Sequence, residues 1–251
     1  MNQYIQNLNR IEFMVTLACT GRCKHCSEGD HYANGEHIDG DLAAEMVRKT
    51  AKNYSIESLM TFGGEPLLYP GEVYKIHSMA REMGIPKRQM ITNGFFSRDT
   101  EKIRLVAQGL VDNGVNDILL SVDAFHQETI PLEPVMTFAK ALIDAGIPRL
   151  RVHPAWLVDT EADNPYNRKT REILAQFQEL GIAVSSGNVI LPKGNALKYF
   201  KEYFDSNTTY ISPYAENPQD IRAICVSPNG DVLQGNIYKT DILEILAKYM
   251  P

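Results

Sequence analysis

The sequence predicts an α/β protein built on a parallel sheet. Segments with strand character alternate with segments of helical periodicity, which is typical of parallel strands joined by right-handed helical crossovers. Two of the predicted helices close with glycine, an apolar residue and proline, at Gly84-Ile85-Pro86 and Gly146-Ile147-Pro148, as is common after helix C-termini. We expect six strand-helix units.

The elements follow one another along the chain. The first strand is expected at 11–16, and a loop leads from it to a helix around 42–47, which Asp39 or Asp41 could cap. The other strands are expected at 58–62, 87–92, 116–122, 149–157 and 182–190, and the other helices at 73–83, 100–113, 133–145 and 169–180.

The alternating pattern stops near residue 198. At 251 residues, 44% of them hydrophobic, the chain can bury a core as one domain with a small appendage. Residues 199–219 are rich in Tyr, Asn and Pro, and residues 224–236 predict a hairpin. We therefore expect a core over 1–197 and a C-terminal extension over 198–251, which ends in a helix and carries substrate specificity.

Composition excludes several classes of protein. The net charge of -6 argues against broad electrostatic capture of nucleic acid, which needs a basic surface. Apolar runs are too short to cross a bilayer. The N-terminal residues have no basic stretch followed by an apolar one, so we expect a cytoplasmic protein without disulfides.

Three of the four cysteines lie within eight residues, Cys19, Cys23 and Cys26. This spacing can hold three corners of a cubane iron-sulfur cluster and leave the fourth iron without a protein ligand. A structural zinc site is an alternative, but zinc usually takes four protein ligands, and the remaining Cys225 has no partner close to it in sequence. Three free thiols are the other alternative.

Three further motifs follow predicted strands. Gly63-Gly64-Glu65-Pro66 ends the strand at 58–62, and bare glycine backbone there can approach a ligand closely. Thr92-Asn93-Gly94 and Ser121-Val122-Asp123 follow the next two strands in the same way. Taken alone, such residues often just end strands or cap helices.

In this order, the cysteine triplet and the three motifs resemble the radical SAM superfamily, whose members reductively cleave S-adenosylmethionine. His25 also stands where that family usually has an aromatic residue or histidine. The resemblance implies a partial (β/α)6 barrel open at one side, with its active site at the C-terminal strand ends. It further implies a 4Fe-4S cluster on Cys19, Cys23 and Cys26, bound S-adenosylmethionine, and a flavodoxin-like or ferredoxin-like electron donor.

The resemblance also implies a role for each motif. Gly63, Gly64 and Glu65 are expected to receive the ammonium group of S-adenosylmethionine, Ser121 and Asp123 its ribose or carboxylate, Thr92 and Asn93 its adenosyl group, and His25 its adenine. The structural alternatives are a helix-start carboxylate for the glutamate, and a cap on the following helix for the serine and aspartate.

Histidines and one arginine are weaker candidates. Arg151 and His153 point to the same face of a strand, so both line the lumen if one does, where they could meet the S-adenosylmethionine carboxylate or the substrate. A solvent-facing arginine and a structural histidine fit equally well. His126 is read as a loop histidine rather than a proton donor, and no role is assigned to His31 and His37.

The hairpin at 224–236 resembles a degenerate fragment of the SPASM or twitch extensions of peptide-modifying radical SAM enzymes. Gly235 stands where a further cysteine is expected, and one thiolate cannot hold a second cubane, so a single cluster is predicted, with the hairpin as a lid or wall. Cys225 points away from Ile224 and Val226, into the core or to the cleft. It is either a hydrogen-atom donor to the substrate or a packed apolar residue.

These observations predict a radical SAM enzyme that acts on a peptide or a small metabolite. The alternative is a non-catalytic iron-sulfur protein that carries electrons or senses redox state. A zinc-binding interaction module comes third.

Overall fold

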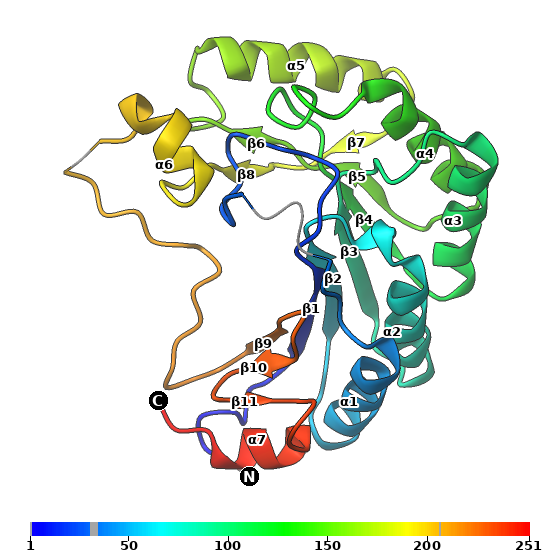
Figure 1. Ribbon diagram of the computed structural model, residues 1–251, viewed down its shortest axis with the longest axis vertical. Coiled ribbons are helices and arrows are strands. Elements are labelled where there is room, and N and C mark those ends of the chain that lie inside the picture. The colour runs from blue at the N-terminus through cyan, green and yellow to red at the C-terminus, as the bar shows by residue number, and fades with distance from the viewer. Residues whose placement is uncertain (1, 31–34, 206) are drawn as a thin grey trace.

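The computed structural model describes residues 2–30, 35–205 and 207–251. Seven parallel strands form one curved sheet in the order β7-β5-β4-β3-β2-β1-β9, with helices α1 to α5 along its outer face (Figure 1). The strands are β1 (Arg10–Thr16), β2 (Ser58–Gly63), β3 (Lys87–Thr92), β4 (Asp117–Leu120), β5 (Leu150–Val152), β7 (Ala183–Val184) and β9 (Ala223–Val226). The helices are α1 (Gly40–Asn53), α2 (Pro70–Glu82), α3 (Thr100–Asp112), α4 (Leu132–Asp144) and α5 (Pro165–Gln178).

This architecture confirms the predicted α/β class and the partial barrel. The sheet does not close, because β7 and β9 are its two edges and do not pair with each other. In the described part of the chain, no helix is long and apolar enough to cross a membrane.

The two faces of the sheet have different side chains, as alternation along each strand requires. Ile11, Phe13 and Val15 of β1 are fully buried on the helix side, where each contributes about 1.5–3 kcal/mol of hydrophobic stabilisation. Between them, Glu12 and Met14 lie on the inner face and are only partly buried. Asp39 is the N-cap of α1, as expected, because its Oδ1 accepts hydrogen bonds from the main-chain N–H groups of Asp41 and Leu42.

Two predicted strands are each divided in two. The segment expected at 149–157 forms β5 and then β6 (Ala155–Trp156), and the segment at 182–190 forms β7 and then β8 (Asn188–Val189). β6 and β8 pair with each other outside the main sheet. The physical cause lies between them, since Pro154 has no N–H to donate to a ladder and Gly187 adopts a positive φ of 73°.

The hairpin predicted at 224–236 forms only in part, and its first strand extends the sheet as a wall and does not form a lid. Its first strand, β9, instead joins the main sheet parallel to β1, with Ile224 beside Ile11 and Cys225 beside Glu12. The hairpin itself is formed only by β10 (Asp231–Val232) and β11 (Gly235–Asn236). The reason is apolar burial, because Ile224 is almost completely buried and needs the same core as β1.

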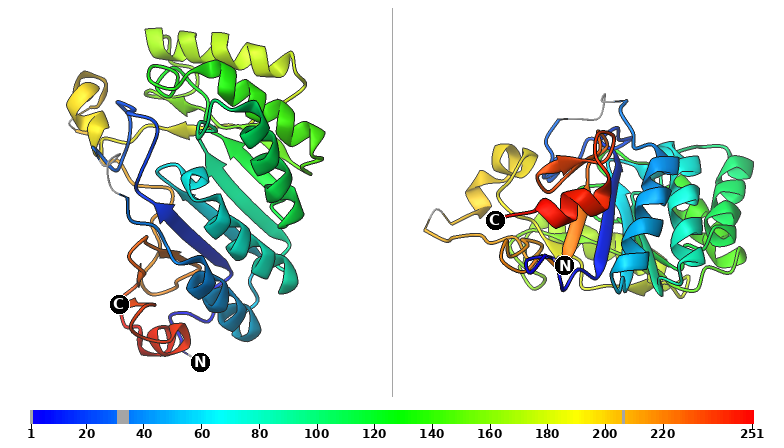
Figure 2. Two further views of the ribbon diagram at one scale, coloured as in Figure 1. Left: turned by 45° about the vertical axis from the view of Figure 1, so that its right-hand side comes forward. Right: turned by 90° about the horizontal axis from the view of Figure 1, so that it is seen from below.

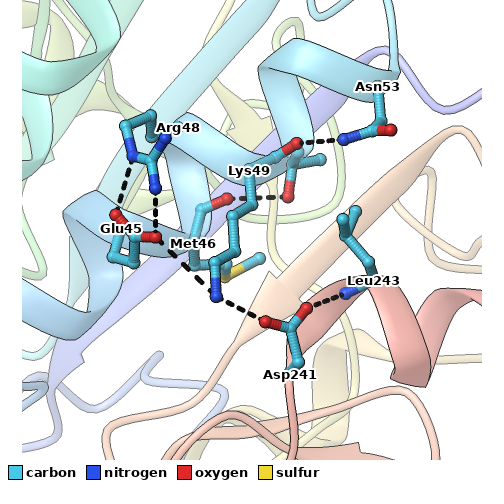
Figure 3. Close-up of polar contacts among 8 residues, drawn as sticks. Glu45, Met46, Arg48, Lys49, Asn53, Asp241 and Leu243 are labelled. Atoms are coloured by element: carbon cyan, nitrogen blue, oxygen red, sulfur yellow. Dashed lines mark hydrogen bonds and ion pairs between the residues drawn. The ribbon is translucent and has the colours of Figure 1, made fainter.

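The last helix, α7 (Ile242–Lys248), packs on α1 and on the hairpin. A Cβ added to Gly235 would lie 2.7 Å from Cγ1 of Ile245, so a cysteine or any other side chain at that position of the hairpin requires the Ile245 side chain to shift. Figure 3 shows Lys49 of α1 paired with Asp241, the N-cap of α7.

The chain ends lie close together (Figures 1 and 2), and the amide of Asn2 donates to the main-chain oxygen of Tyr249 at 2.7 Å. The shorter elements are the 3-10 turns η1 (Pro66–Leu68) and η2 (Lys201–Tyr203) and the helix α6 (Asn195–Tyr199).

Candidate active site

The three clustered cysteines line one cavity at the C-terminal ends of the strands. The loop that carries them follows β1, and strand ends from β2, β3 and β4 complete the wall. The predicted residues that line this cavity are Cys19, Cys23, His25, Cys26, Gly63, Gly64, Thr92, Asn93 and Ser121. Motifs that are up to 102 positions apart in the sequence therefore meet at one place.

The thiols fit a cationic metal group. Burial, followed by the effects of Glu65 and the neighbouring Cys26, raises the pKa of Cys19 to about 11, although the N–H of Gly21 opposes this. Burial likewise raises the pKa of Cys23 and of Cys26. Three thiolates are therefore costly at this site unless bound iron compensates their charge.

The geometry also favours a cluster over a single zinc ion. Within the described ranges, the ligand atoms that come close enough together for one ion belong to His25, Asp123 and His126, and no cysteine is among them. Cysteines that share a cavity without converging on one point suit a larger, multi-iron group.

Glycine backbone brings the end of β2 against the start of the cysteine loop. Gly63 has a φ of 136°, and a Cβ added to Gly64 would lie 2.1 Å from the main-chain oxygen of Ala18. The same oxygen accepts a 2.8 Å hydrogen bond from the N–H of Glu65. Side chains at these two positions would push the loop away, so the glycines set the distance between the cysteines and the strand end.

Glu65 lies fully buried behind the cavity wall. Its Oε1 accepts hydrogen bonds from the N–H of Leu67 and the hydroxyl of Thr92, and its Oε2 accepts one from the N–H of Asn93. Burial raises its pKa to about 7 against these three bonds. A carboxylate offers about four acceptor positions, so one remains beyond the three used here. The carboxylate joins the ends of β2 and β3.

Asn93 contacts the cysteine loop directly. Its Nδ2 lies 3.5 Å from Sγ of Cys19 and 3.2 Å from the hydroxyl of Thr20, while its Oδ1 accepts from the N–H of Phe95. A hydrogen bond to a ligating sulfur tunes the charge on that sulfur. This contact with a cysteine was not anticipated from the sequence.

Asp123 is fully buried, and its hydrogen bonds go to the turn after β4 and to Ala155, not to the following helix α4, whose N-cap is Pro131. Oδ1 accepts from the N–H groups of Phe125 and His126, and Oδ2 accepts from the N–H of Ala155 and from Nδ1 of His126. Burial would raise the pKa of Asp123, but the charge and hydrogen bonds of His126 hold it well below its usual range. The carboxylate therefore orders the turn that follows β4.

His126, which was read as a loop histidine, lies in the cavity wall. Its ring meets that of His25 with centroids 4.7 Å apart, and His25 also packs on Phe125 at 5.1 Å. Burial, followed by the effect of His126, lowers the pKa of His25 to about 4. The spacing of Asp123 and His126, three residues apart in one turn, was the sequence signal that could have identified this pair.

Other candidates lie away from this cavity. Arg151 donates from Nη2 to both carboxylate oxygens of Asp117, at 2.7 and 2.8 Å, and Nδ1 of His153 pairs with the hydroxyl of Ser185. Neither Arg151 nor His153 lines the cavity wall. His37 stacks on the ring of Tyr69, and His31 lies outside the described residues.

A segment far along the chain completes the wall. The N–H of Asn195 donates to the main-chain oxygen of Cys26 at 2.9 Å, and a Cβ on Gly194 would lie 2.5 Å from that oxygen. This contact fixes the end of the cysteine loop. No local pattern around residues 194–195 indicates it.

The strands form a partial parallel barrel, and three cysteines and a glycine turn meet at its C-terminal edge. This combination defines an iron-sulfur enzyme of the barrel type. The family model described as the radical SAM superfamily matches residues 13–206, and the chain belongs to this superfamily. Membership makes the protein an enzyme and implies a 4Fe-4S cluster and S-adenosylmethionine as its cofactors.

Individual relatives share only low sequence identity with this chain. A protein named probable GTP 3',8-cyclase from Saccharolobus islandicus is 27% identical over 221 residues, which are 82% of this chain and 64% of that protein. A protein of the same name from Methanocaldococcus jannaschii is 22% identical over 159 residues, 61% of this chain and 51% of the relative. The chain thus spans less than two thirds of the length of these relatives.

Solved structures share the fold. SuiB of Streptococcus suis, bound to its precursor peptide SuiA, superposes with a TM-score of 0.61 at 12% identity, covering 97% of this chain and 65% of that one. The anSMEcpe structure with bound AdoMet gives a TM-score of 0.60 at 14% identity, covering 95% of this chain and 80% of that one.

Proposed function

We propose that this enzyme reductively cleaves S-adenosylmethionine at a single 4Fe-4S cluster held by Cys19, Cys23 and Cys26. The observation that carries the proposal is that these thiols, Gly63-Gly64 and the ends of β3 and β4 share one cavity. When bound, the reduced cluster and S-adenosylmethionine supply a 5'-deoxyadenosyl radical, which abstracts hydrogen from the substrate.

The chain's own residues position these groups. The main chain at Gly63 and Gly64, which line the cavity, receives the ammonium group. Glu65 lies behind this wall and supplies its remaining acceptor position to the same group. Thr92, Asn93 and Ser121 line the space for the adenosyl group. Glu65 also holds Thr92 and Asn93 in place, so it supports that wall even where it does not touch the ligand.

Anaerobic reconstitution followed by reaction with dithionite and S-adenosylmethionine tests this function. We expect visible absorption from the cluster and formation of 5'-deoxyadenosine. A cluster without 5'-deoxyadenosine would favour the non-catalytic electron carrier or redox sensor, and bound zinc in place of iron would favour the interaction module. Glu65→Ala should keep the iron but weaken S-adenosylmethionine binding, since a hydrogen bond to a charged group is worth roughly 1.5–3 kcal/mol.

A peptide is the first candidate substrate. On the inner face of the sheet Arg10 pairs with Glu12, and Arg151 pairs with Asp117, so neither of these two arginines offers an uncompensated charge to a triphosphate. The structural neighbours SuiB and anSMEcpe have both been solved with peptides. A nucleotide is the second candidate, because the curated relatives are named as GTP cyclases. Mass spectrometry of reactions with each class of substrate separates the two, and a flavodoxin-like or ferredoxin-like protein is the proposed electron donor.

Cys225 is proposed to face the substrate. It is the most accessible of the four cysteines, and its strand neighbours Ile224 and Val226 are buried on the opposite face. In register beside it, Glu12 points to the inner face of the sheet. Partial desolvation, followed by the effects of Glu12 and Glu28, raises the pKa of the Cys225 thiol to about 12. The thiol therefore stays protonated, the state that can give a hydrogen atom.

A further inference from the structure

The outer edge of β9 is a short row of main-chain groups without a neighbouring strand. β9 pairs with β1 on one side, and no strand of the described residues lies on its other side. The N–H of Arg10 donates to the main-chain oxygen of Arg222. Because successive residues of a strand point their main-chain groups to opposite sides, those of Ala223 and Cys225 point away from β1. Cys225 is exposed, so another chain can reach this edge.

One carboxylate occupies the start of the edge. Oε2 of Glu216 accepts hydrogen bonds from the N–H groups of Arg222 and Ala223, at 2.7 and 3.0 Å. The C=O of Ala223 and both main-chain groups of Cys225 remain for a strand that lies beside β9. Arg222 pairs with Asp220, and within the described ranges Glu216 forms no ion pair, so the charge of Glu216 is not compensated there.

A strand added to β9 would extend the sheet across the open side of the barrel. β7 and β9 are the two edges of the main sheet, and the cavity with the cluster cysteines lies at the C-terminal ends of the strands between them. Alternate side chains of a strand face the same side, so every second residue of an added strand would face inward, as Glu12 of β1 does.

Apolar side chains border the same opening. Residues 207–222, called the strap below, lead from the α6 side of the opening to β9 (Figure 1). Ile211 and Tyr214 of the strap are 75% and 69% exposed. The hydroxyl of Tyr214 donates to Oδ1 of Asn188 in β8 at 2.5 Å, which fixes the strap at the border opposite β9. Both side chains offer contact area to a chain that crosses the opening.

These features define the chemistry of the ligand. Alternating main-chain groups are best paired by another main chain, and an uncompensated carboxylate attracts a cation and repels a phosphate. We propose that the substrate is an extended peptide that binds by strand addition to the outer edge of β9, with a lysine or arginine beside Glu216. This inference rests on the peptide substrate proposed above and adds its mode of recognition.

Random peptides displayed on phage, selected on the anaerobic, cluster-loaded enzyme with S-adenosylmethionine, are the probes. We expect enrichment of sequences that contain lysine or arginine. Synthetic copies then carry a methyl group on one main-chain nitrogen at a time, and their affinities are measured. Methylation of two residues that are separated by one should weaken binding roughly three- to tenfold each, because alternate N–H groups face β9. Methylation of the residue between them should have no effect.

Two pairs of variants locate the site. Cys225→Pro removes an N–H that β1 does not use, which edge strands tolerate, and should weaken binding roughly three- to tenfold. Cys225→Ala keeps that N–H and should bind the peptides like the wild type. Glu216→Gln keeps an acceptor for the start of β9 but loses the charge, so at low salt it should bind basic peptides about two- to fivefold more weakly. Glu202→Gln removes the same charge from η2 and should have no effect.

The absence of enriched peptides, or a methylation scan without alternation, would overturn the inference, and the scan is decisive even where the proline variant does not fold. Light scattering tests the other occupant. A wild-type dimer that Cys225→Pro dissociates would assign the edge to a second copy of this chain and overturn the peptide. Formation of 5'-deoxyadenosine is measured on the same preparation, and its absence would refute the proposed function whether or not peptides bind.

Discussion

The main-chain N–H of Glu65 donates a hydrogen bond of 2.8 Å to the main-chain oxygen of Ala18, the residue before the first cluster cysteine. This bond ties the end of β2 to the start of the cysteine loop. The contact is possible only because Gly64, beside Glu65, has no side chain in the space next to that oxygen.

Gly64→Ala should therefore displace the cysteine loop. Its Cβ would lie 2.1 Å from the oxygen of Ala18, and overpacking of this kind costs about 1–3 kcal/mol. We expect lower unfolding free energy by chemical denaturation and less iron per chain. Gly71→Ala is the matched control, since nothing lies within 4 Å of its added Cβ and its stability should be unchanged or slightly higher. Equal iron content in both variants would contradict the prediction.

Replacement of Cys19, Cys23 and Cys26 together by alanine should abolish iron binding. The wild type is expected to hold about four irons and four sulfides per chain after anaerobic reconstitution. Cys225→Ala is the control and should retain the full complement. Iron near eight per chain in the wild type would rule out a single cluster.

His77 should make the protein sensitive to acid. Burial, with a smaller effect from Arg88, lowers its pKa to about 3, while its Nε2 pairs with the hydroxyl of Thr61. Between pH 6.5 and 3 the unfolded chain binds a proton that the folded protein does not. The contribution of the neutral histidine is complete above pH 6.5, and the unfolding free energy falls by about 1.4 kcal/mol per pH unit as the pH is lowered through this window.

His77→Gln cannot take up this proton, so its stability should depend less on pH. Chemical denaturation at pH 7 and pH 5 measures both proteins, and the difference between them cancels the groups that they share. We expect the wild type to lose about 2 kcal/mol more than the variant over this interval. Parallel pH profiles would show that the buried histidine is not the cause.

Asp241 should stabilise the C-terminal helix mainly as its N-cap. It accepts the N–H of Leu243 at 2.9 Å and pairs with Lys49 across the contact that Figure 3 shows. Asp241→Ala should cost about 1 kcal/mol, whereas Asp241→Asn keeps the cap, loses only an exposed ion pair and should cost a few tenths. Thermal melts at low and high salt distinguish these contributions, because only the ion pair is screened. A larger loss in the Asn variant than in the Ala variant would refute this assignment.

Cys225→Ala should keep the cluster and still cleave S-adenosylmethionine. If Cys225 is the hydrogen-atom donor, the variant given its true substrate should form 5'-deoxyadenosine but little product. Chromatography of both products from one reaction measures the ratio. A normal product yield would eliminate the donor role and leave Cys225 as a passive edge-strand residue.

Much of the fold was predictable because local sequence patterns determine where its strands and helices begin and end. The alternation of Ile11, Phe13 and Val15 with partly buried neighbours marks β1, and Asp39 marks the start of α1. The spacing of the cysteines and the glycine turn is equally local. Since parallel strands end at one edge of a sheet, the motifs that follow them had to meet there.

The tertiary structure alone decided which side chains face the cavity. Asp123 was expected at the cavity, and its carboxylate accepts hydrogen bonds from its own turn and from Ala155, while His126, to which no functional role was assigned, lines the wall. In the same way, β9 pairs with β1 in the main sheet and is not part of the predicted hairpin. Asn195, which is distant in sequence, forms a hydrogen bond with the end of the cysteine loop. The physical reason is common to all three cases. Hydrogen-bond saturation, strand register and apolar burial depend on partners that are distant in sequence. Local periodicity therefore cannot predict these contacts.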